Sequence, residues 1–318
     1  MTHRIVFLDR DSVPAKLPRP AFPHEWQAYG QTTPEEIAER LAGATIAISN
    51  KVPLRADVLA RLPDLQMIAI AATGSDNVDL DYCRARGIVV SNVRGYAGRT
   101  VPEHVMTLML VLRRNLLAYR ADIRGGRWQR SKHFCFADHP IRDLAGSTLA
   151  IVGSGALGQG VAALARAFGM HVFQVERKGA LEVRPGFLSF AEALAQADVI
   201  SLHCPLTPET RQLIGAPELA LMKPGALLIN TARGALVDEA ALASALRAGR
   251  IGAGLDVLSK EPPDAGNPLL APDLLELPNV ILTPHVAWAS GKAVADLARQ
   301  LIDNIEAFEA GQPRNVLT

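Results

Sequence analysis

The sequence predicts an α/β protein with two doubly wound parallel sheets, each covered by helices. Short apolar runs alternate with amphipathic stretches of helical spacing along the chain, and one run leads directly into a glycine-rich turn. The chain has 318 residues, of which 49% are hydrophobic. That is enough to bury the cores of two domains.

The apolar runs indicate buried strands because each is too short for a helix and ends in polar or turn residues. They are Ile5–Leu8, Ile46–Ser49, Met67–Ala71, Ile88–Ser91, Leu149–Val152, Val172–Val175, Val199–His203, Ala226–Asn230 and Val280–Thr283. Helices are expected between many of them, at Pro34–Leu41, Val161–Phe168, Phe190–Ala197 and Glu239–Ala248. Asp238 can cap the last helix and Gly249 can close it.

A long helix and an irregular segment separate two groups of strands. The helical spacing runs from Val101 to about Arg124, and the next 19 residues, Gly125–Asp143, are charged and carry three aromatic side chains. A loop of this length is usually functional or interfacial. We expect its aromatics to be buried against a partner subunit or the other domain, in preference to a solvated loop.

The last predicted helix, residues 291–311, follows the second sheet directly. We expect it to cross back and cover the first domain. The first domain would then be discontinuous, with residues 1–98 and 290–318, and the second would comprise residues 99–289.

Composition excludes several classes of function. Positive and negative charges nearly balance at a net charge of +1, so nucleic acid and anionic membranes are unlikely partners. The apolar run at the start is only four residues long, too short for a signal peptide, and no run approaches the roughly 18 residues of a membrane span. Cys83, Cys135 and Cys204 form no metal-binding pattern, so we expect no metal and a reducing cytoplasm.

The glycine-rich turn predicts a Rossmann-like dinucleotide site. Gly153, Gly155 and Gly158 form Gly-x-Gly-x-x-Gly after a buried strand and before an alanine-rich helix. The pyrophosphate would meet the helix N-terminus, where backbone N–H groups are free. Glu176 ends the next strand and is placed to accept hydrogen bonds from the adenosine ribose, which favours NAD. Arg177 and Lys178 follow at once, so NADP stays possible.

Three polar residues each follow an apolar strand in the second domain, at the end of the sheet where ligands bind. Arg233 offers two parallel N–H donors that fit a carboxylate. His285 can donate the proton that ketone reduction by hydride requires, and Glu261 can orient its ring. None of the three is convincing alone, but together they complete one reaction.

These motifs resemble the D-isomer-specific 2-hydroxyacid dehydrogenase family. The similarity is ordered and spans nearly the whole chain: the glycine-rich turn, Asn-Thr-Ala-Arg-Gly at 230–234, Asp-Val-x-x-x-Glu-Pro at 256–262 and Thr-Pro-His at 283–285. Residues 71–79 and 101–104 resemble the family's first-domain loop and crossover helix. Residues 123–128 and 283–290 are most similar to its glycerate dehydrogenase (hydroxypyruvate reductase) branch.

The resemblance implies a flavodoxin-like substrate domain beside the NAD-binding domain, a homodimer, and roles for individual residues. Arg233, Glu261 and His285 would be catalytic, with Arg233 also binding substrate. Thr73 and Gly74 would hold the carboxylate through backbone N–H groups, with Asn50 or Lys51 near the substrate. The residues expected around the cofactor are Gly153, Gly155, Ala156, Leu157, Gly158, Glu176, Cys204, Pro205, Thr210, Thr231, Ala232, Arg233, Asp256, His285 and Trp288.

The function expected on this basis is NAD(P)H-dependent reduction of a small 2-oxo acid to its D-2-hydroxy acid, first hydroxypyruvate to D-glycerate and also glyoxylate to glycolate. Reduction of another 2-oxo acid, such as pyruvate or phenylpyruvate, stays open. A dinucleotide-sensing corepressor-like binding protein is a weaker alternative, because such relatives carry long partner-binding extensions that this chain lacks.

Overall fold

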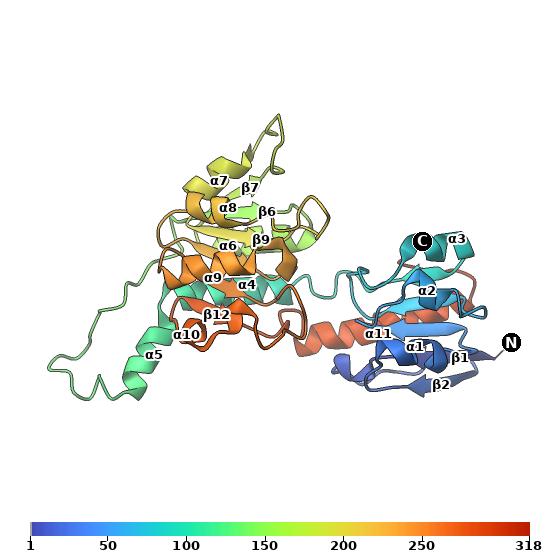
Figure 1. The fold of residues 1–318 in the computed structure, drawn as a ribbon. Coiled ribbons are helices and arrows are strands. Elements are labelled where there is room, and N and C mark those ends of the chain that lie inside the picture. The colour runs from blue at the N-terminus through green and yellow to red at the C-terminus, as the bar shows by residue number, and fades with distance from the viewer. Residues whose placement is uncertain (1) are drawn as a thin grey trace. The chain divides into compact units, whose positions relative to one another are not determined.

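The computed structural model describes residues 2–318, which divide into two compact units (Figure 1). The first unit contains residues 2–97 and 289–318, and the second contains residues 98–288. Each unit is built on one parallel sheet with helices on both faces, so the α/β prediction with two doubly wound sheets is confirmed.

The first unit has a five-stranded sheet in the order β2-β1-β3-β4-β5. This is the flavodoxin-like order, with the sequence direction reversing between β1 and β3. The strands are β1 (His3–Phe7), β2 (His24–Ala28), β3 (Ile46–Ser49), β4 (Met67–Ile70) and β5 (Val89–Ser91).

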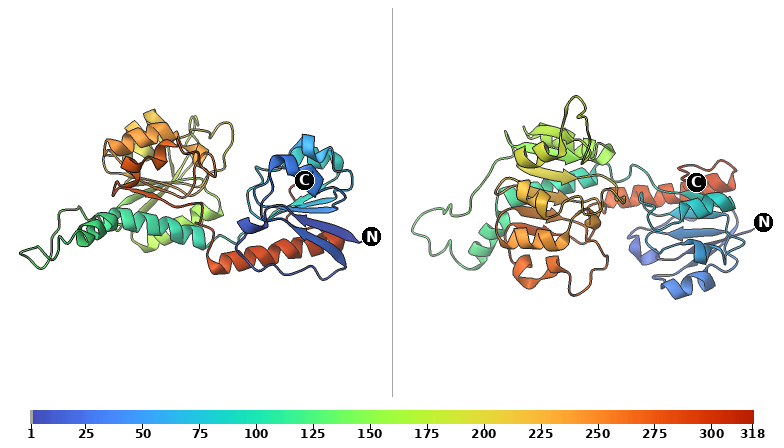
Figure 2. Two further views of the ribbon diagram at one scale, coloured as in Figure 1. Left: turned by 60° about the horizontal axis from the view of Figure 1, so that its bottom comes forward. Right: turned by 45° about the horizontal axis from the view of Figure 1, so that its top comes forward.

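Helices cover both faces of this sheet (Figure 2). One face carries the short helices α1 (Ile37–Arg40), α2 (Ala56–Leu59) and α3 (Leu80–Arg86). The other carries α11 (Gly291–Glu309), which packs on β4. Leu297, Leu301 and Ile305 of α11 are buried. The C-terminal helix thus completes the core of the first unit.

The second unit has a seven-stranded sheet in the order β12-β11-β10-β9-β6-β7-β8. The first six strands along the chain follow the Rossmann order, which reverses between β6 and β9. The strands are β6 (Thr148–Val152), β7 (His171–Val175), β8 (Phe187–Leu188), β9 (Val199–Leu202), β10 (Leu227–Asn230), β11 (Gly252–Leu255) and β12 (Val280–Leu282).

Two layers of helices enclose the second sheet. Helices α4 (Thr100–Arg113) and α6 (Ala156–Ala167) pack together on one face. The other face carries α7 (Phe190–Gln196), α8 (Ala216–Leu221), α9 (Glu239–Arg247) and α10 (Pro272–Leu275). Asp238 caps α9 by accepting from the N–H groups of Ala240 and Ala241, as predicted.

The structure departs from the sequence-based expectations at several places, among them the short strand β8, which was not predicted. The long helix predicted from Val101 to about Arg124 is interrupted, since α5 (Leu116–Arg124) begins after Asn115, whose φ is +49°. Asparagine tolerates this left-handed conformation better than most residues. Strand β2 was not predicted, because its sequence HEWQA contains no apolar run; it is an edge strand paired only with β1.

No helix within residues 2–318 is long and apolar enough to span a membrane. In the same residues, no group of three or more His, Cys, Asp or Glu side chains is arranged to hold a metal ion.

Candidate active site

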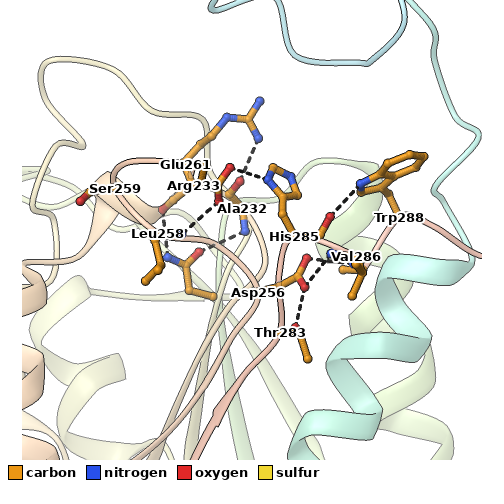
Figure 3. A network of polar contacts seen from close by, with 12 residues as sticks. Ala232, Arg233, Asp256, Leu258, Ser259, Glu261, Thr283, His285, Val286 and Trp288 are labelled. Carbon is orange, nitrogen blue, oxygen red and sulfur yellow. Dashed lines mark hydrogen bonds and ion pairs between the residues drawn. The ribbon is translucent and has the colours of Figure 1, made fainter. Parts of the chain in front are cut away.

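The predicted catalytic residues follow β10, β11 and β12, which are neighbours in the second sheet. Because the three strands are parallel, their carboxyl ends lie at the same edge of the sheet. Figure 3 shows Arg233, Glu261 and His285 grouped at this edge.

His285 and Glu261 form a direct hydrogen bond. The Nδ1 atom of His285 lies 2.6 Å from Oε2 of Glu261, and Oε1 of Glu261 accepts from the backbone N–H of Leu258. The carboxylate is therefore fixed at one oxygen and orients the ring with the other. The Nε2 atom of His285 has no hydrogen-bond partner within residues 2–318, so it can serve a ligand.

Asp256 holds the loop that carries His285. Its carboxylate is 1% exposed and accepts from Thr283 Oγ1 at 2.5 Å and from the N–H groups of Val286 and Ala287 at 2.9 Å (Figure 3). The backbone N–H of His285 donates to the Asp256 carbonyl, and the φ of His285 is +56°. These bonds fix a backbone conformation that histidine rarely adopts.

Arg233 lies in a turn that the side chain of Asn230 stabilises. Asn230 is buried; its amide donates to the carbonyl of Arg233 and its oxygen accepts from the N–H of Ala232. The guanidinium of Arg233 donates to the carbonyl of Ala232 through Nη1 at 2.8 Å. The hydroxyl of Thr231, in the same turn, is buried without a partner, which marks a place for a ligand atom.

The glycine-rich turn fits a dinucleotide. The φ of Gly153 is +109°, and a Cβ there would lie 2.6 Å from the backbone of His203 and Cys204. A Cβ on Gly158 would lie 2.2 Å from the carbonyl of Gly153, whereas one on Gly155 would meet nothing within 4 Å. Two glycines therefore serve close packing, and the third leaves open space at the N-terminus of α6 for a pyrophosphate.

The loop after β9 lies against this turn. Thr210 stabilises it by donating to the carbonyl of Pro205 and accepting from the N–H of Thr207. Burial raises the pKa of the Cys204 thiol, so this cysteine is a poor nucleophile at neutral pH. Burial also lowers the pKa of His203 to about 4. His203 is hydrogen-bonded to Ser201.

Glu176 directly follows β7, as predicted, but its carboxylate is already bound by another side chain. Its carboxylate forms a bidentate ion pair with Arg184, through Nε at 2.6 Å and Nη2 at 2.9 Å. The hydrogen bonds from the Arg184 side chain and from the N–H of Arg177 lower the pKa of Glu176 to about 2.

The substrate residues predicted in the first unit follow β3 and β4. The hydroxyl of Thr73 donates to the carbonyl of Val93. The backbone N–H groups of Thr73 and Gly74 have no acceptor within residues 2–318. The N–H of Asn50 is instead bound by the carboxylate of Asp9, and its side chain donates to Ser12.

A family model describes most of the second unit. Residues 106–287 match the NAD-binding domain of the D-isomer-specific 2-hydroxyacid dehydrogenases. The chain belongs to this family. It is therefore an NAD(P)-dependent oxidoreductase of the α/β class.

Individual relatives cover 90% or more of the chain. A glycerate dehydrogenase of Methylorubrum extorquens is 55% identical over 321 residues, with 100% of this chain and 99% of that protein aligned. A hydroxypyruvate reductase of Blautia hydrogenotrophica is 35% identical over 90% of this chain and 88% of that protein. Among solved structures, an acyclic imino acid reductase in complex with NADPH and D-arginine has a TM-score of 0.84 and 30% identity, covering 99% of this chain and 100% of that one.

Sequence reasoning missed several residues that shape the site of this family member. Asn230 was noticed only as part of a motif, although a buried polar residue at a strand end is a recognisable signal. Thr283 hydrogen-bonds both Asp256 and His104, a network that only the fold brings together. Arg184 lies eight residues after its partner in an irregular loop, where no periodicity marks it.

Proposed function

We propose that this chain reduces hydroxypyruvate to D-glycerate, and glyoxylate to glycolate, with a reduced nicotinamide cofactor. The observation that carries the chemistry is the His285–Glu261 hydrogen bond at the edge of the sheet that also presents Arg233. The choice of substrate is supported by the similarity to a glycerate dehydrogenase and a hydroxypyruvate reductase.

Each side chain has one task in this proposal. Arg233 binds the substrate carboxylate in a bidentate manner and polarises the neighbouring carbonyl. The bound cofactor supplies the hydride that reaches the carbonyl carbon. His285 donates the proton from Nε2 to the carbonyl oxygen, which becomes the hydroxyl, and then regains a proton from solvent. Glu261 stabilises the protonated ring through Nδ1 and keeps Nε2 directed outward.

The cofactor is assigned to the second unit. The N–H groups of Ala156, Leu157 and Gly158 at the start of α6 would hold the pyrophosphate, and the orphan hydroxyl of Thr231 would serve the same ligand. The expected lining residues Cys204, Pro205, Thr210, Ala232 and Trp288 belong to this unit as well. We assign residues 99–289 to the NAD-binding domain accordingly.

The first unit is assigned to the substrate. Residues 1–98 and 290–318 would form the substrate domain, with the free N–H groups of Thr73 and Gly74 suited to a carboxylate. Asn50 is expected near the substrate, although its backbone N–H is already bound to Asp9.

We further propose that the enzyme is a cytoplasmic homodimer. The arm formed by α5 and residues 125–143 exposes large apolar side chains, with Trp128 52% and Phe134 90% exposed. Burying them against a second copy would remove this exposure. The three cysteines form no disulfide, which fits a reducing compartment. Phe134→Asp should therefore shift the sedimentation coefficient toward a monomer; a wild-type chain that already sediments as a monomer would refute the dimer.

The experiment that tests the function is a panel of 2-oxo acids assayed with NADH and NADPH. Hydroxypyruvate and glyoxylate should give the highest kcat/KM, above pyruvate and phenylpyruvate. In Arg233→Lys, KM should rise strongly because an ammonium cannot make the bidentate contact. Turnover of pyruvate above hydroxypyruvate would favour the other-acid alternative, and tight cofactor binding without any turnover would favour the corepressor-like one.

A further inference from the structure

The two loops that follow β4 and β5 in the first unit are hydrogen-bonded to each other. These strands are parallel neighbours, so both loops leave the same edge of the sheet. The side-chain amide of Asn92, directly after β5, donates to the carbonyl of Thr73 at 2.7 Å. The N–H of Val93 donates to the carbonyl of Ala72 at 3.0 Å, and the hydroxyl of Thr73 donates to the carbonyl of Val93 at 2.8 Å. Three hydrogen bonds thus hold the first loop against the second.

These bonds fix the directions of two backbone N–H groups. In a planar trans peptide, the carbonyl of one residue and the N–H of the next point in opposite directions. The bond to the carbonyl of Ala72 therefore sets the direction of the N–H of Thr73. In the same way, the bond from Asn92 to the carbonyl of Thr73 sets the direction of the N–H of Gly74. Neither N–H group has an acceptor within residues 2–318, so both are left for a ligand.

Asn92 is itself held on three sides. Its side-chain oxygen accepts from Nε of Arg94 at 3.0 Å. Its backbone N–H donates to the carbonyl of Asn315 at 3.3 Å, and its carbonyl accepts from the side chain of Asn304 at 2.8 Å. The side chain of Asn92 is buried, and its amide group is directed at the carbonyl of Thr73. The donor that fixes this carbonyl is therefore rigid.

Asn304 supports this arrangement from α11. It is fully buried, in the same helix as the buried side chains of Leu301 and Ile305. Burying an amide costs free energy unless its polar atoms are hydrogen-bonded. Asn304 donates to the carbonyl of Asn92 and accepts from the side-chain amide of Asn315 at 3.0 Å. A polar residue at this apolar position thus serves to hold Asn92.

We propose that Asn92 is a positioning residue for substrate binding, which directs the N–H of Gly74 at the substrate carboxylate by holding the carbonyl of Thr73. The proposal rests on the proposed function, in which this loop holds the carboxylate of the 2-oxo acid. The bonds of Asn304 and Asn315 to Asn92 suffice to tie the C-terminal segment to the sheet, but they do not account for the bond to Thr73. An N–H group whose direction is fixed beforehand binds an anion more tightly, because less conformational freedom is lost on binding.

Steady-state kinetics with hydroxypyruvate and NADH test the proposal in Asn92→Leu, which removes the amide with little change in side-chain volume. KM for hydroxypyruvate should rise about tenfold or more, since a hydrogen bond to a charged group contributes at least that much to affinity. The carboxylate keeps its charge during the reaction, so kcat should fall less than about threefold. The Kd of NADH should stay at its wild-type value, because the cofactor is assigned to the second unit. An unchanged KM, or a fall in kcat and NADH affinity without a rise in KM, would overturn the proposal.

Oxamate binding separates the role of Asn92 from turnover. Oxamate carries a carboxylate beside an amide carbonyl that accepts hydride poorly, so its affinity for the NADH-loaded protein can be measured by calorimetry. Its Kd should rise about tenfold in Asn92→Leu, in step with KM. An unchanged oxamate Kd in the variant, or a wild-type protein that binds no oxamate, would overturn the proposal. If Asn92→Leu loses oxamate binding but the wild type reduces no 2-oxo acid, the proposed function fails and the role of Asn92 stands.

Asn315→Gly is the matched control. The φ of Asn315 is +54°, which glycine adopts without strain. The change removes an amide that donates to Asn304 and Gln300, but it leaves the bond from Asn92 to Thr73. Asn315→Gly should lower the urea midpoint and leave KM for hydroxypyruvate at the wild-type value. If Asn315→Gly raises KM as much as Asn92→Leu does, the effect is a general loss of stability and Asn92 has no specific role.

A second variant covers the case in which Asn92→Leu does not fold. Asn92→Ala is smaller and leaves Arg94 and the carbonyl of Thr73 to water. It should raise KM for hydroxypyruvate and the Kd of oxamate together, again without changing the Kd of NADH. A folded Asn92→Ala that keeps both wild-type values would overturn the proposal.

Discussion

The glycine-rich turn gives a sharp prediction because two of its glycines are required for different reasons. In Gly153→Ala, the new methyl group would lie 2.6 Å from backbone atoms of His203 and Cys204, on a residue with a φ of +109°. In Gly155→Ala, the methyl group would meet no protein atom within 4 Å, and the φ of −70° suits alanine. The first change should damage the fold, and the second should damage only cofactor binding.

The magnitudes follow from these contacts. An alanine held at such a φ costs about 1–3 kcal/mol, and displacing the backbone against it costs about 1–3 kcal/mol more. We therefore expect Gly153→Ala to lose about 2–6 kcal/mol of unfolding free energy. For Gly155→Ala, a weaker helix N-cap and a less flexible unfolded chain nearly cancel, so the change should stay within about 1 kcal/mol.

Urea unfolding and NADH fluorescence titration measure the two effects separately. Gly155→Ala should unfold at the wild-type urea midpoint yet bind NADH at least tenfold more weakly, since its methyl group projects into the space left for the pyrophosphate. If Gly155→Ala binds NADH normally, the turn does not hold the pyrophosphate as we infer. If Gly153→Ala has the same urea midpoint as wild type, the backbone of His203 does not approach position 153 closely enough to exclude a methyl group.

Three further predictions concern the polar groups around the site. Glu261→Gln should lower kcat by about 10–100-fold and leave the NADH affinity unchanged. The amide oxygen still accepts from Nδ1 of His285, but it no longer stabilises a positively charged ring. An unaltered kcat in steady-state kinetics would contradict this. Asp256→Ala should lower the unfolding free energy by at least about 3 kcal/mol. The hydroxyl of Thr283 and the N–H groups of Val286 and Ala287 would lose their acceptor, whose side chain is only 1% exposed. An unshifted urea midpoint would argue against the anchoring role of Asp256. His203 has its pKa lowered to about 4 by burial, so its protonation favours the unfolded chain. Wild-type stability should fall by up to about 3 kcal/mol between pH 6.5 and 4, and His203→Gln should show a flatter pH dependence; parallel curves would refute this.

The elements that bury an apolar run could be predicted from the sequence. Strands such as β3 and β9 are buried on both faces, so their composition alone identifies them. Strand β2 could not be predicted in this way, because an edge strand can be polar. The break at Asn115 was missed because helical spacing continues through it without a glycine or proline.

In the candidate site too, some residues could be predicted from the sequence and others could not. Arg233, Glu261 and His285 were predicted because each lies just after a strand and suits one part of a single reaction. The anchoring of the His285 loop by Asp256 and the neutralisation of Glu176 by Arg184 depend on contacts between segments that loops bring together. Residue type and spacing carry no signal for such contacts.

The most direct test of the central claim is to compare wild-type enzyme with His285→Asn, measuring kcat for hydroxypyruvate and the Kd of NADH. Asparagine tolerates the φ of +56° at this position but cannot donate the proton. We predict that kcat falls by about 10²–10⁴-fold, the range that general acid catalysis supplies, while the Kd of NADH changes less than threefold. A variant that reduces hydroxypyruvate at a rate near that of wild type would contradict the assignment of His285 as the proton donor.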